Sequence, residues 1–482
     1  MSTTVAIIGG GFSGTMVAAH LLRRGVQGRV LLVERLGPFS GGIAYGTRCG
    51  AHLLNVPTGR MSALPDDEDH FLRWMQRREP ETTGGTFSPR LVYGQYLRQV
   101  LAEAEAEAPP WCGLERMPGE AIALEPLGGG GVQMRLADGR RLACDAAVLA
   151  VGNFQPADPP LVDASGLDDP RYARDAWAHD ALDVDPDAPV LLIGTGLTTI
   201  DIILRLIDQG HRGPIHAVSR RGLLPQAHRH SAVAPAAYPR PVSIDGWPRN
   251  AAGLVRALRD EVRMAAAHGV DWREVLAAIR HDTPPIWAEL DAGTRGRLLR
   301  HLRPYWETHR HRAAPEPWAA VQRCMDAGQL QPRAARLLGI APSARGLAVT
   351  LRARGRDTVE QLVVGRVVNC TGPDTDLSRV REPLIVSMRQ AGQLRPDAFG
   401  LGLDTDDDGA LLDASGQPDD RLYLVGPLRK GRLWENTAVP ELRVEAAALA
   451  ARLAARFAAA SPSRRPKDEV RVKASAIAPD FR

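Results

Sequence analysis

Apolar residues gather twice along the chain in a short run that leads into a glycine-rich turn and then into a helical pattern. The first run covers residues 5–8 and the second residues 190–193. The turns contain Gly9, Gly11, Ser13 and Gly14 in the first copy, and Gly194, Gly196 and Thr199 in the second. In both copies another strand-like run ends 25 residues after the first glycine, at Glu34 and at Ser219. The pattern predicts the same strand-turn-helix-strand unit twice.

Further strand-like runs follow each unit. Residues 120–152 contain three such runs separated by turn residues, and residues 336–372 contain three more. The last run of each set is apolar and ends in a glycine, Gly152 in the first and Gly372 in the second. The last strand of a parallel sheet ends in this way before the chain leaves the domain. We therefore predict an α/β protein with two doubly wound, Rossmann-like dinucleotide-binding domains.

The second copy is the longer one, because residues 253–338 follow a helical pattern that Pro and Gly interrupt. Residues 153–188 are rich in Pro and Asp and are expected to link the two domains. The C-terminal part predicts one more strand and a long Ala-rich helix. The predicted boundaries are 1–155 with 372–460 for the first domain, 186–371 for the second with a helical insertion at about 250–335, and 461–482 for a disordered tail.

The two turns indicate different nucleotides. A glycine turn before a helix lets a pyrophosphate bind the unpaired N–H groups at the helix N-terminus. Glu34, next to Arg35, can accept hydrogen bonds from both ribose hydroxyls and would repel a 2′-phosphate, which suits the ADP half of FAD. The second copy has Ser219 at the corresponding position, followed by Arg220 and Arg221. Two guanidinium groups match a phosphate, so this copy is predicted to bind NADPH, with NADH as a possible second coenzyme.

Composition narrows the class of protein. The chain has 482 residues, a net charge of +4 and scattered Arg in place of a lysine-rich block, so nucleic acid is not the expected partner. Its five cysteines show no C-x-x-C or metal-ligand spacing, which predicts free thiols and neither a disulfide framework nor a redox-active dithiol. No apolar run approaches the length of a membrane span. We expect a cytoplasmic protein without membrane contact.

Five further segments carry a resemblance to a known family. They are GGIAYGT (41–47), HLLNVPTGRMS (52–62), VSRRGLLPQAH (218–228), LRPYWETHRHR (302–312) and GPLRKGRLWENTAVPELR (426–443). Together they resemble the FAD/NAD(P)-binding family that contains the FAD-dependent urate hydroxylase of bacteria. The resemblance implies an NAD(P)H-oxidising monooxygenase that uses molecular oxygen through a flavin C4a-hydroperoxide, with urate or a related heterocycle as its small-molecule substrate.

Three other functions share these features. The first is an FAD-dependent N-hydroxylase of an amine or amino acid, which needs the same cofactors. The second is a non-oxygenating NAD(P)H oxidoreductase, although the absence of C-x-x-C argues against disulfide reduction. The third is a nucleotide-binding regulatory module without turnover. The sequence leaves the oligomeric state open.

Candidate catalytic residues lie in the segment that follows the second strand, where a loop would return toward the flavin ring. Asn55 is the candidate for contact with flavin N5 or its oxygen adduct, because a neutral amide donates a hydrogen bond without transferring a proton. The alternative for Asn55 is a turn residue near Pro57. His52 is a candidate base or a core histidine. Arg60 is predicted to bind either an anionic substrate or the FAD pyrophosphate.

The C-terminal segment is also expected to reach the flavin. Asn436 or Thr437 is predicted to cap a helix whose N-terminus points at the flavin C2 carbonyl. Trp434 would stack near the flavin or fill the domain interface. Gly426 would contact the ribityl chain through its backbone; Pro427 stands where many relatives have an aspartate, so Leu428 would have to serve beside it.

The histidines do not predict a metal site. His228 and His230, like His309 and His311, are spaced i, i+2, and two such side chains do not share one helix face. His228 is instead expected to touch the NADPH phosphate or to close the site. The run 300–312, dense in Arg and His, is either a solvated helix face or a lid over the substrate.

Overall fold

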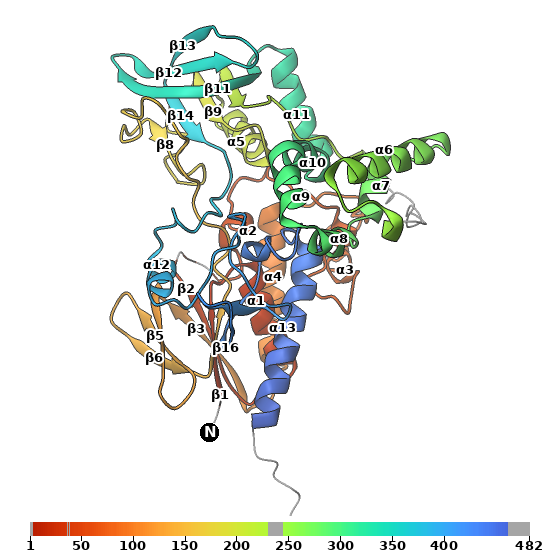
Figure 1. Cartoon of the computed structure of the whole chain (residues 1–482), viewed down its shortest axis with the longest axis vertical. Coiled ribbons are helices and arrows are strands. Elements are labelled where there is room, and N and C mark those ends of the chain that lie inside the picture. Colours follow the sequence, from red (N-terminus) through yellow and green to blue (C-terminus); the bar gives the residue numbers. More distant parts are fainter. Residues whose placement is uncertain (1–2, 36, 38, 230–243, 461–482) are drawn as a thin grey trace, which may run out of the picture.

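The computed structural model describes residues 3–35, 37, 39–229 and 244–460. The predicted tail at 461–482 and His230 lie outside these residues. Figure 1 shows two bodies, one above the other, each built around a sheet, with a group of helices projecting from one side between them. No helix in the described ranges is long and apolar enough to cross a membrane.

The first sheet has six strands in the order β15-β16-β7-β1-β2-β3, and all neighbours except β15 and β16 run parallel. The strands are β1 (Thr3–Ile8), β2 (Gly28–Glu34), β3 (Cys112–Pro118), β7 (Ala146–Leu149), β15 (Ala410–Leu412) and β16 (Pro418–Leu424). Two of them come from beyond residue 400, so the C-terminal part returns to the first unit.

Alternating residues of the central strands face two different layers. Val5 and Ile7 pack with three helices, α1 (Phe12–Arg23), α4 (Arg90–Ala106) and α13 (Val439–Ala460). Ala6 and Ile8 face a separate three-stranded antiparallel sheet, β4 (Ala121–Pro126), β5 (Val132–Leu136) and β6 (Arg141–Cys144), together with α12 (Pro383–Gln390). Helices thus cover one face, and mainly a small sheet covers the other.

The second sheet has seven strands in the order β13-β12-β11-β10-β9-β14-β8. They are β8 (Tyr172–Ala173), β9 (Val190–Ile193), β10 (Ile215–Ser219), β11 (Leu330–Ser343), β12 (Gly346–Ala353), β13 (Val359–Val364) and β14 (Arg366–Asn369). The closing strands β7 and β14 each pair in parallel with the strand before a glycine turn, β1 and β9. The repeated unit predicted from the sequence is therefore present twice.

Helices α5 (Leu197–Asp208) and α11 (Pro315–Asp326) pack together on one face of the second sheet, around Ile203, Val321 and Cys324. The other helices between β10 and β11 project from the body (Figure 1): α6 (Ala251–Ala267), α7 (Trp272–Ala278), α8 (Thr283–Glu289), α9 (Ala292–Arg297), the π-helical turn η3 (Leu298–Leu302) and α10 (Arg303–Arg310). Short elements are α2 (Gly42–Tyr45), η1 (Thr58–Arg60), α3 (His70–Gln76), η2 (Ile244–Gly246) and η4 (Pro427–Arg429).

Three details differ from the sequence prediction. Pro284 and Pro285 do not separate helices but lie in the first turn of α8, where the missing N–H groups cost nothing. Strand β11 begins at Leu330, within the range assigned to the helical insertion, since its first residues pair with β10. The segment expected to be only a linker contributes β8, a two-residue edge strand.

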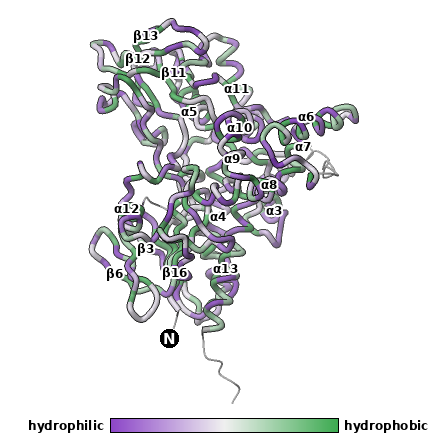
Figure 2. The backbone as a smooth tube through the Cα atoms, viewed as in Figure 1, coloured by the Kyte–Doolittle hydropathy of each residue, from purple (hydrophilic) through white to green (hydrophobic). Residues whose placement is uncertain are grey.

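Hydropathy along the chain follows this arrangement. In Figure 2 apolar residues line the strands of both sheets and the helices packed on them, while the projecting helices alternate between apolar and polar positions. The apolar positions of the projecting helices form two small clusters of their own, one around Trp247 and Leu276 and one around Trp287 and Trp434. The second cluster joins the helices to the C-terminal segment of the first unit.

Candidate functional site

After the first glycine turn, the N-terminus of helix α1 has no side-chain cap and lies against closely packed backbone. Helix α1 has Gly11 at its N-cap, and no side chain caps it. Gly9 has φ of 112°, and a Cβ there would lie 2.3 Å from the carbonyl oxygen of Ala150. A Cβ on Gly14 would lie 1.9 Å from the carbonyl oxygen of Gly9. Only glycine lets these backbones meet and leaves the N–H groups accessible to a phosphate.

Two further glycine segments face this turn. A Cβ on Gly42 would lie 3.2 Å from Gly11 Cα, and a Cβ on Gly426, which has φ of 106°, would lie 3.2 Å from Ser13 Oγ. Side chains at these positions would fill the space in front of α1. Gly152, at φ of 68°, lies three residues after the end of the neighbouring strand β7. The three segments thus form a cradle that fits the pyrophosphate and ribityl parts of FAD.

Glu34 ends β2 beside the cradle. Its Oε2 accepts a hydrogen bond from Gly10 N–H at 2.7 Å, which holds the carboxylate over the glycine turn. The adjacent Arg35 points elsewhere and forms an exposed ion pair with Glu120 at 3.3 Å. The position of Glu34 therefore fits the predicted contact with the adenosine ribose, whereas the side chain of Arg35 is paired at the surface.

We expect Glu34→Ala to lose FAD during purification. A hydrogen bond from a ribose hydroxyl to a charged acceptor contributes about 1.5 to 3 kcal/mol, so losing one weakens binding at least tenfold. The measurement is the ratio of flavin to protein absorbance after gel filtration. Glu120→Ala, which removes only the surface partner of Arg35, is the control and should keep its flavin. Stoichiometric FAD in Glu34→Ala would show that the carboxylate does not hold the cofactor.

The second glycine turn repeats the geometry with one difference. Gly194 has φ of 120°, and a Cβ there would lie 2.5 Å from the carbonyl oxygen of Cys370. Gly196 is the N-cap of α5, again without a side-chain cap, and a Cβ on it would meet no atom within 4 Å. At the third position, Thr199 is fully buried. This open, uncapped N-terminus fits the pyrophosphate of a nicotinamide coenzyme.

The residues after β10 present one free guanidinium to solvent. Ser219 Oγ accepts a hydrogen bond from Gly222 N–H at 2.9 Å and lies 2.9 Å from Thr195 Oγ1, so this hydroxyl shapes the turn. Arg221 stacks on Tyr305 of α10, with 5.5 Å from its guanidinium carbon to the ring centre. Arg220 is exposed and has no ion-pair partner in the described ranges. Arg220 is thus the better placed of the two to meet a 2′-phosphate.

Arg220→Ala should raise the KM for NADPH about tenfold, which corresponds to about 1.4 kcal/mol, and leave the KM for NADH nearly unchanged. The reason is that only NADPH carries the phosphate that this guanidinium would bind. Steady-state kinetics with both coenzymes measure the effect. Arg212→Ala, at an exposed ion pair with Asp187, serves as the control. An equal loss with both coenzymes would remove Arg220 from the phosphate site.

A buried ion pair joins the two units. Arg90 of α4 donates two hydrogen bonds to Asp201 of α5, at 2.9 and 3.1 Å, and a third to the carbonyl of Leu53. His52 is fully buried in the same contact: its Nε2 donates to the carbonyl of Asp201 at 3.0 Å, and its Nδ1 accepts from Thr47 at 2.8 Å. Burial lowers the pKa of His52, so its ring is neutral. These contacts give His52 a positioning role at the interface.

Asn55 and Arg60 lie together in a small cavity of about 40 Å³, with room for only a few water molecules. The projecting helices and the segment after β10 complete its walls. The lining residues, which we call the arginine pocket, are Asn55, Val56, Pro57, Arg60, His228, Ala277, Arg280, Arg310 and Arg312. The structure therefore brings two of the predicted catalytic candidates together with Arg310 and Arg312 of the run 300–312, and with Arg280, which the sequence analysis did not select.

His228 closes one side of the arginine pocket. Its Nε2 donates a hydrogen bond to the carbonyl of Asn55 at 3.0 Å, and its ring lies 5.1 Å from that of Phe87. Burial, reinforced by Arg312, lowers the pKa of His228 to about 3. The ring is therefore neutral at physiological pH. It connects the segment after β10 to the loop of Asn55.

Carboxylates balance two of the four guanidiniums in the arginine pocket. Arg280 forms a bidentate ion pair with Glu441 at the start of α13. Arg310 pairs with Glu435 at 3.0 Å. No carboxylate of the described residues lies within ion-pair distance of the side chains of Arg60 or Arg312. Within the described residues, the guanidiniums of Arg60 and Arg312 therefore have no ion-pair partner, although the carboxylates of Glu274 and Asp271 act on Arg312 from a longer distance.

Glu435 links the C-terminal segment to the pocket wall. Its side chain is 2% exposed, and it accepts a hydrogen bond from Trp306 Nε1 at 2.7 Å besides pairing with Arg310. Burial acts to raise the pKa of Glu435, but His311 and Arg310 outweigh it and hold the pKa below its usual value. Its φ of 76° is strained for a residue with a side chain. Glu435 thus stays ionised and fixes Arg310.

The residues around Glu435 fill the interface. Trp434 is buried and stacks on Trp287 of α8, with 4.6 Å between ring centroids. Helix α13 begins at Val439, and the carbonyl of Ala438 accepts its first hydrogen bonds, so Asn436 and Thr437 lie before the cap. The helix therefore begins one or two residues later than the predicted cap positions require. Asn436 instead donates its side-chain N–H to Glu445, which also binds Gly426 N–H.

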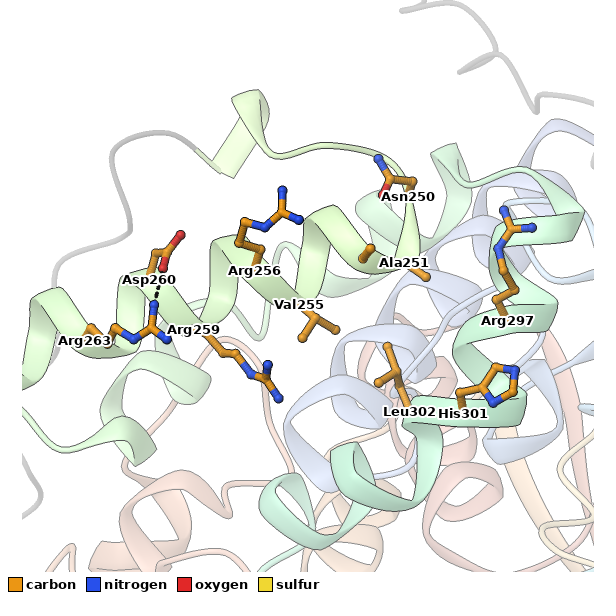
Figure 3. A pocket seen from close by; sticks show the side chains of 11 residues that line it. Asn250, Ala251, Val255, Arg256, Arg259, Asp260, Arg263, Arg297, His301 and Leu302 are labelled. Carbon is orange, nitrogen blue, oxygen red and sulfur yellow. Dashed lines mark hydrogen bonds and ion pairs between the residues drawn. The ribbon is translucent and has the colours of Figure 1, made fainter.

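A larger cavity, about 810 Å³, lies elsewhere on the projecting helices (Figure 3). Helix α6 contributes Arg256, Arg259 and Arg263 to one wall, and Arg297 and His301 stand on the other. None of its lining residues belongs to the glycine turns or the arginine pocket. In the described part of the chain no cluster of His, Cys, Asp and Glu could hold a metal ion. All five cysteines are free, as predicted.

Comparisons with known proteins agree with a nucleotide-binding site at each of the two glycine turns. Residues 6–154 match the family described as FAD-NAD(P)-binding, which confirms the predicted cofactors FAD and NAD(P)H. The chain is also similar to nitrosuccinic acid synthase of Aspergillus oryzae, at 25% identity over 269 residues. That match covers 47% of this chain and 41% of the relative, so less than half of the relative's length is represented.

Solved structures resemble the chain over nearly its whole length. Ornithine hydroxylase from Pseudomonas aeruginosa matches with a TM-score of 0.63 and 16% identity, covering 95% of this chain and 99% of that one. L-lysine 6-monooxygenase from Pseudomonas syringae matches with a TM-score of 0.63 and 17% identity, covering 96% and 100%. Thioredoxin reductase from Lactococcus lactis matches at 0.51 and 13%, covering 96% and 100%. These likenesses confirm the predicted α/β fold with Rossmann-like units.

Proposed function

We propose that this chain is an FAD-dependent, NAD(P)H-oxidising monooxygenase that hydroxylates the amine nitrogen of an amino acid. In this proposal residues 1–155 and 372–460 hold FAD, and residues 186–371 hold NAD(P)H. The names of two similar structures, an ornithine hydroxylase and a lysine monooxygenase, and that of the curated relative point to amino or nitro compounds. The proposal corresponds to the N-hydroxylase alternative of the sequence analysis and replaces urate as the preferred substrate.

The arginine pocket is the observation that carries the proposal. It joins Asn55 to the segment of Glu435 through Arg310, and both segments were predicted from the sequence to reach the flavin. A guanidinium offers a planar fork of N–H donors that matches a carboxylate. An amino acid bound there by its carboxylate would place its amine within the pocket, where Asn55 offers both a donor and an acceptor.

The overall reaction converts the amine R–NH2, O2, NAD(P)H and a proton into the hydroxylamine R–NHOH, water and NAD(P)+. Bound FAD supplies the redox chemistry, by accepting hydride from NAD(P)H and activating oxygen. The protein contributes binding, orientation and exclusion of water. His228 closes the pocket toward the second unit, and Glu435 fixes Arg310. The contact between Arg90 and Asp201 holds the two nucleotide-binding units together.

The arginine pocket also favours the reactive form of the substrate. An amine must be neutral to use its lone pair, and nearby positive charges lower the pKa of an amine. The guanidiniums of Arg60 and Arg312 have no ion-pair partner among the described residues, so they would oppose protonation of an amine placed between them. A urate anion could bind the same donors, and urate therefore remains the competing substrate that an experiment must include.

The test is NADPH oxidation in air by the FAD-loaded protein, with amino acids in one series and urate in another. We expect amino acids to accelerate NADPH oxidation and to yield a hydroxylamine, detected by iodine oxidation and by mass spectrometry. Hydrogen peroxide should account for only a minor share of the oxygen consumed. Acceleration and consumption of urate without any reaction of amines would instead support the function implied by the family resemblance.

A further inference from the structure

The charges of the arginine pocket indicate which class of amino acid it can bind. Two of its guanidiniums, those of Arg280 and Arg310, are paired with Glu441 and Glu435. His228, the remaining titratable side chain in the lining, is neutral because burial lowers its pKa to about 3. The pocket therefore presents two positive charges, on Arg60 and Arg312, that have no ion-pair partner in the described part of the protein.

Arg312 supplies the inner charge. Its Nε is buried and has no hydrogen-bond partner in the described structure, and its guanidinium carbon lies 5.8 Å from the ring centre of Trp272. Burial, and then the neighbouring Arg310, lower the pKa of Arg312 to about 10, which still leaves it charged at neutral pH. A buried donor without an acceptor is costly, and an anionic ligand would satisfy it.

Arg60 supplies the outer charge. It ends the short helix η1, and its side chain is exposed at the edge of the same cavity. Because the cavity holds only a few water molecules, a substrate must displace part of its lining, and an exposed arginine can move aside and then close over a bound anion. The two unpaired arginines thus lie at the inner wall and at the mouth of one small space.

We propose that the substrate of this pocket is an acidic amino acid, whose two carboxylates are bound by Arg312 inside and by Arg60 at the mouth. The proposal rests on the function proposed above and narrows its substrate class. A second carboxylate would neutralise the second guanidinium, whereas the cationic side chain of ornithine or lysine would be repelled by both. The curated relative is named for nitrosuccinic acid, which is also a dicarboxylic acid.

The experiment compares amines that differ in charge, using the FAD-loaded protein with NADPH in air. We expect aspartate or glutamate to give a kcat/KM at least tenfold higher than alanine, ornithine or lysine. Succinate, which has two carboxylates and no amine, should inhibit competitively, whereas acetate should not. Efficient turnover of ornithine or lysine with no inhibition by succinate would overturn the dicarboxylate proposal and leave N-hydroxylation standing.

Two variants assign the carboxylate contacts. Arg312→Met and Arg60→Met should each raise the KM for the acidic amino acid and the inhibition constant of succinate tenfold or more. Arg60 is exposed, so its variant keeps the test valid even if Arg312→Met folds poorly. Arg263→Met, at an exposed ion pair on α6, is the matched control and should behave as the wild type.

Different results would refute the proposed N-hydroxylation and the proposed dicarboxylate site. Competition by succinate, weakened in both variants, but no hydroxylamine from any amine, would refute N-hydroxylation and retain a dicarboxylate site. Unchanged inhibition by succinate in both variants would refute the assignment to Arg60 and Arg312, because removing either charge must weaken the binding of a dicarboxylate held between them.

Discussion

Asp201→Asn is expected to lower the free energy of unfolding by about 3 to 5 kcal/mol, because it leaves the buried guanidinium of Arg90 without its counter-charge. The side chains of Arg90 and Asp201 are only 10% and 8% exposed. Burial raises the pKa of Asp201 while Arg90 opposes that rise, so the carboxylate depends on its partner. Urea denaturation followed by tryptophan fluorescence measures the change.

Asp260→Asn is the matched control, since Asp260 pairs with Arg263 on an exposed helix face, at 52% and 75% exposure. Such a pair contributes about 0.5 kcal/mol or less. The double variant Arg90→Met/Asp201→Leu, which removes both charges, should recover part of the loss. A change below about 1 kcal/mol in Asp201→Asn would mean that the contact between α4 and α5 is not held by this ion pair.

Gly14→Ala should destabilise the first unit by about 3 kcal/mol, the upper end of the cost of overpacking, and abolish FAD retention. The added methyl group would lie 1.9 Å from the carbonyl oxygen of Gly9 and 3.1 Å from Ala150 Cβ, so α1 must move away from its turn. The second unit has the buried Thr199 at the corresponding position, so its own turn accommodates a side chain there. Flavin absorbance and urea denaturation give the two measurements.

Gly11→Ala tests the effect on FAD binding separately from the effect on protein stability. A methyl group on Gly11 meets its nearest atom, Gly42 Cα, only at 3.9 Å, so the free energy of unfolding of the flavin-free protein should change by less than about 1 kcal/mol. The same methyl group would occupy the cradle, so FAD binding should weaken. If Gly14→Ala retained FAD as well as the wild type, the cradle would not be the cofactor site.

Local sequence patterns were sufficient to predict most of the fold. An apolar run, a glycine turn and a strand ending in Glu34 or Ser219 are all encoded within about 30 residues, so both repeated units could be predicted from the chain. The prediction failed at prolines, because proline can either interrupt a helix or occupy its first turn. Pro and Gly were expected to interrupt the helices of the insertion, whereas Pro284 and Pro285 lie inside the first turn of α8.

The arginine pocket could be predicted only in part, because it depends on packing between distant segments. The run 300–312 was considered as a lid, but its charge pattern does not show which arginines turn inward. The structure pairs Arg303 with Glu307 near the surface, while Arg310 and Arg312 line the pocket. The π-helical turn η3 before α10 shifts the helix phase, so the spacing rules of a regular α-helix do not apply across it.

The most direct test of the proposed monooxygenase is the fate of labelled oxygen. The FAD-loaded protein should be supplied with NADPH, an acidic amino acid and ¹⁸O2, and the product analysed by mass spectrometry. Our account predicts a hydroxylamine that carries one ¹⁸O atom, formed in an amount close to the NADPH consumed. Unlabelled amino acid recovered intact, with the label entirely in hydrogen peroxide, would contradict it.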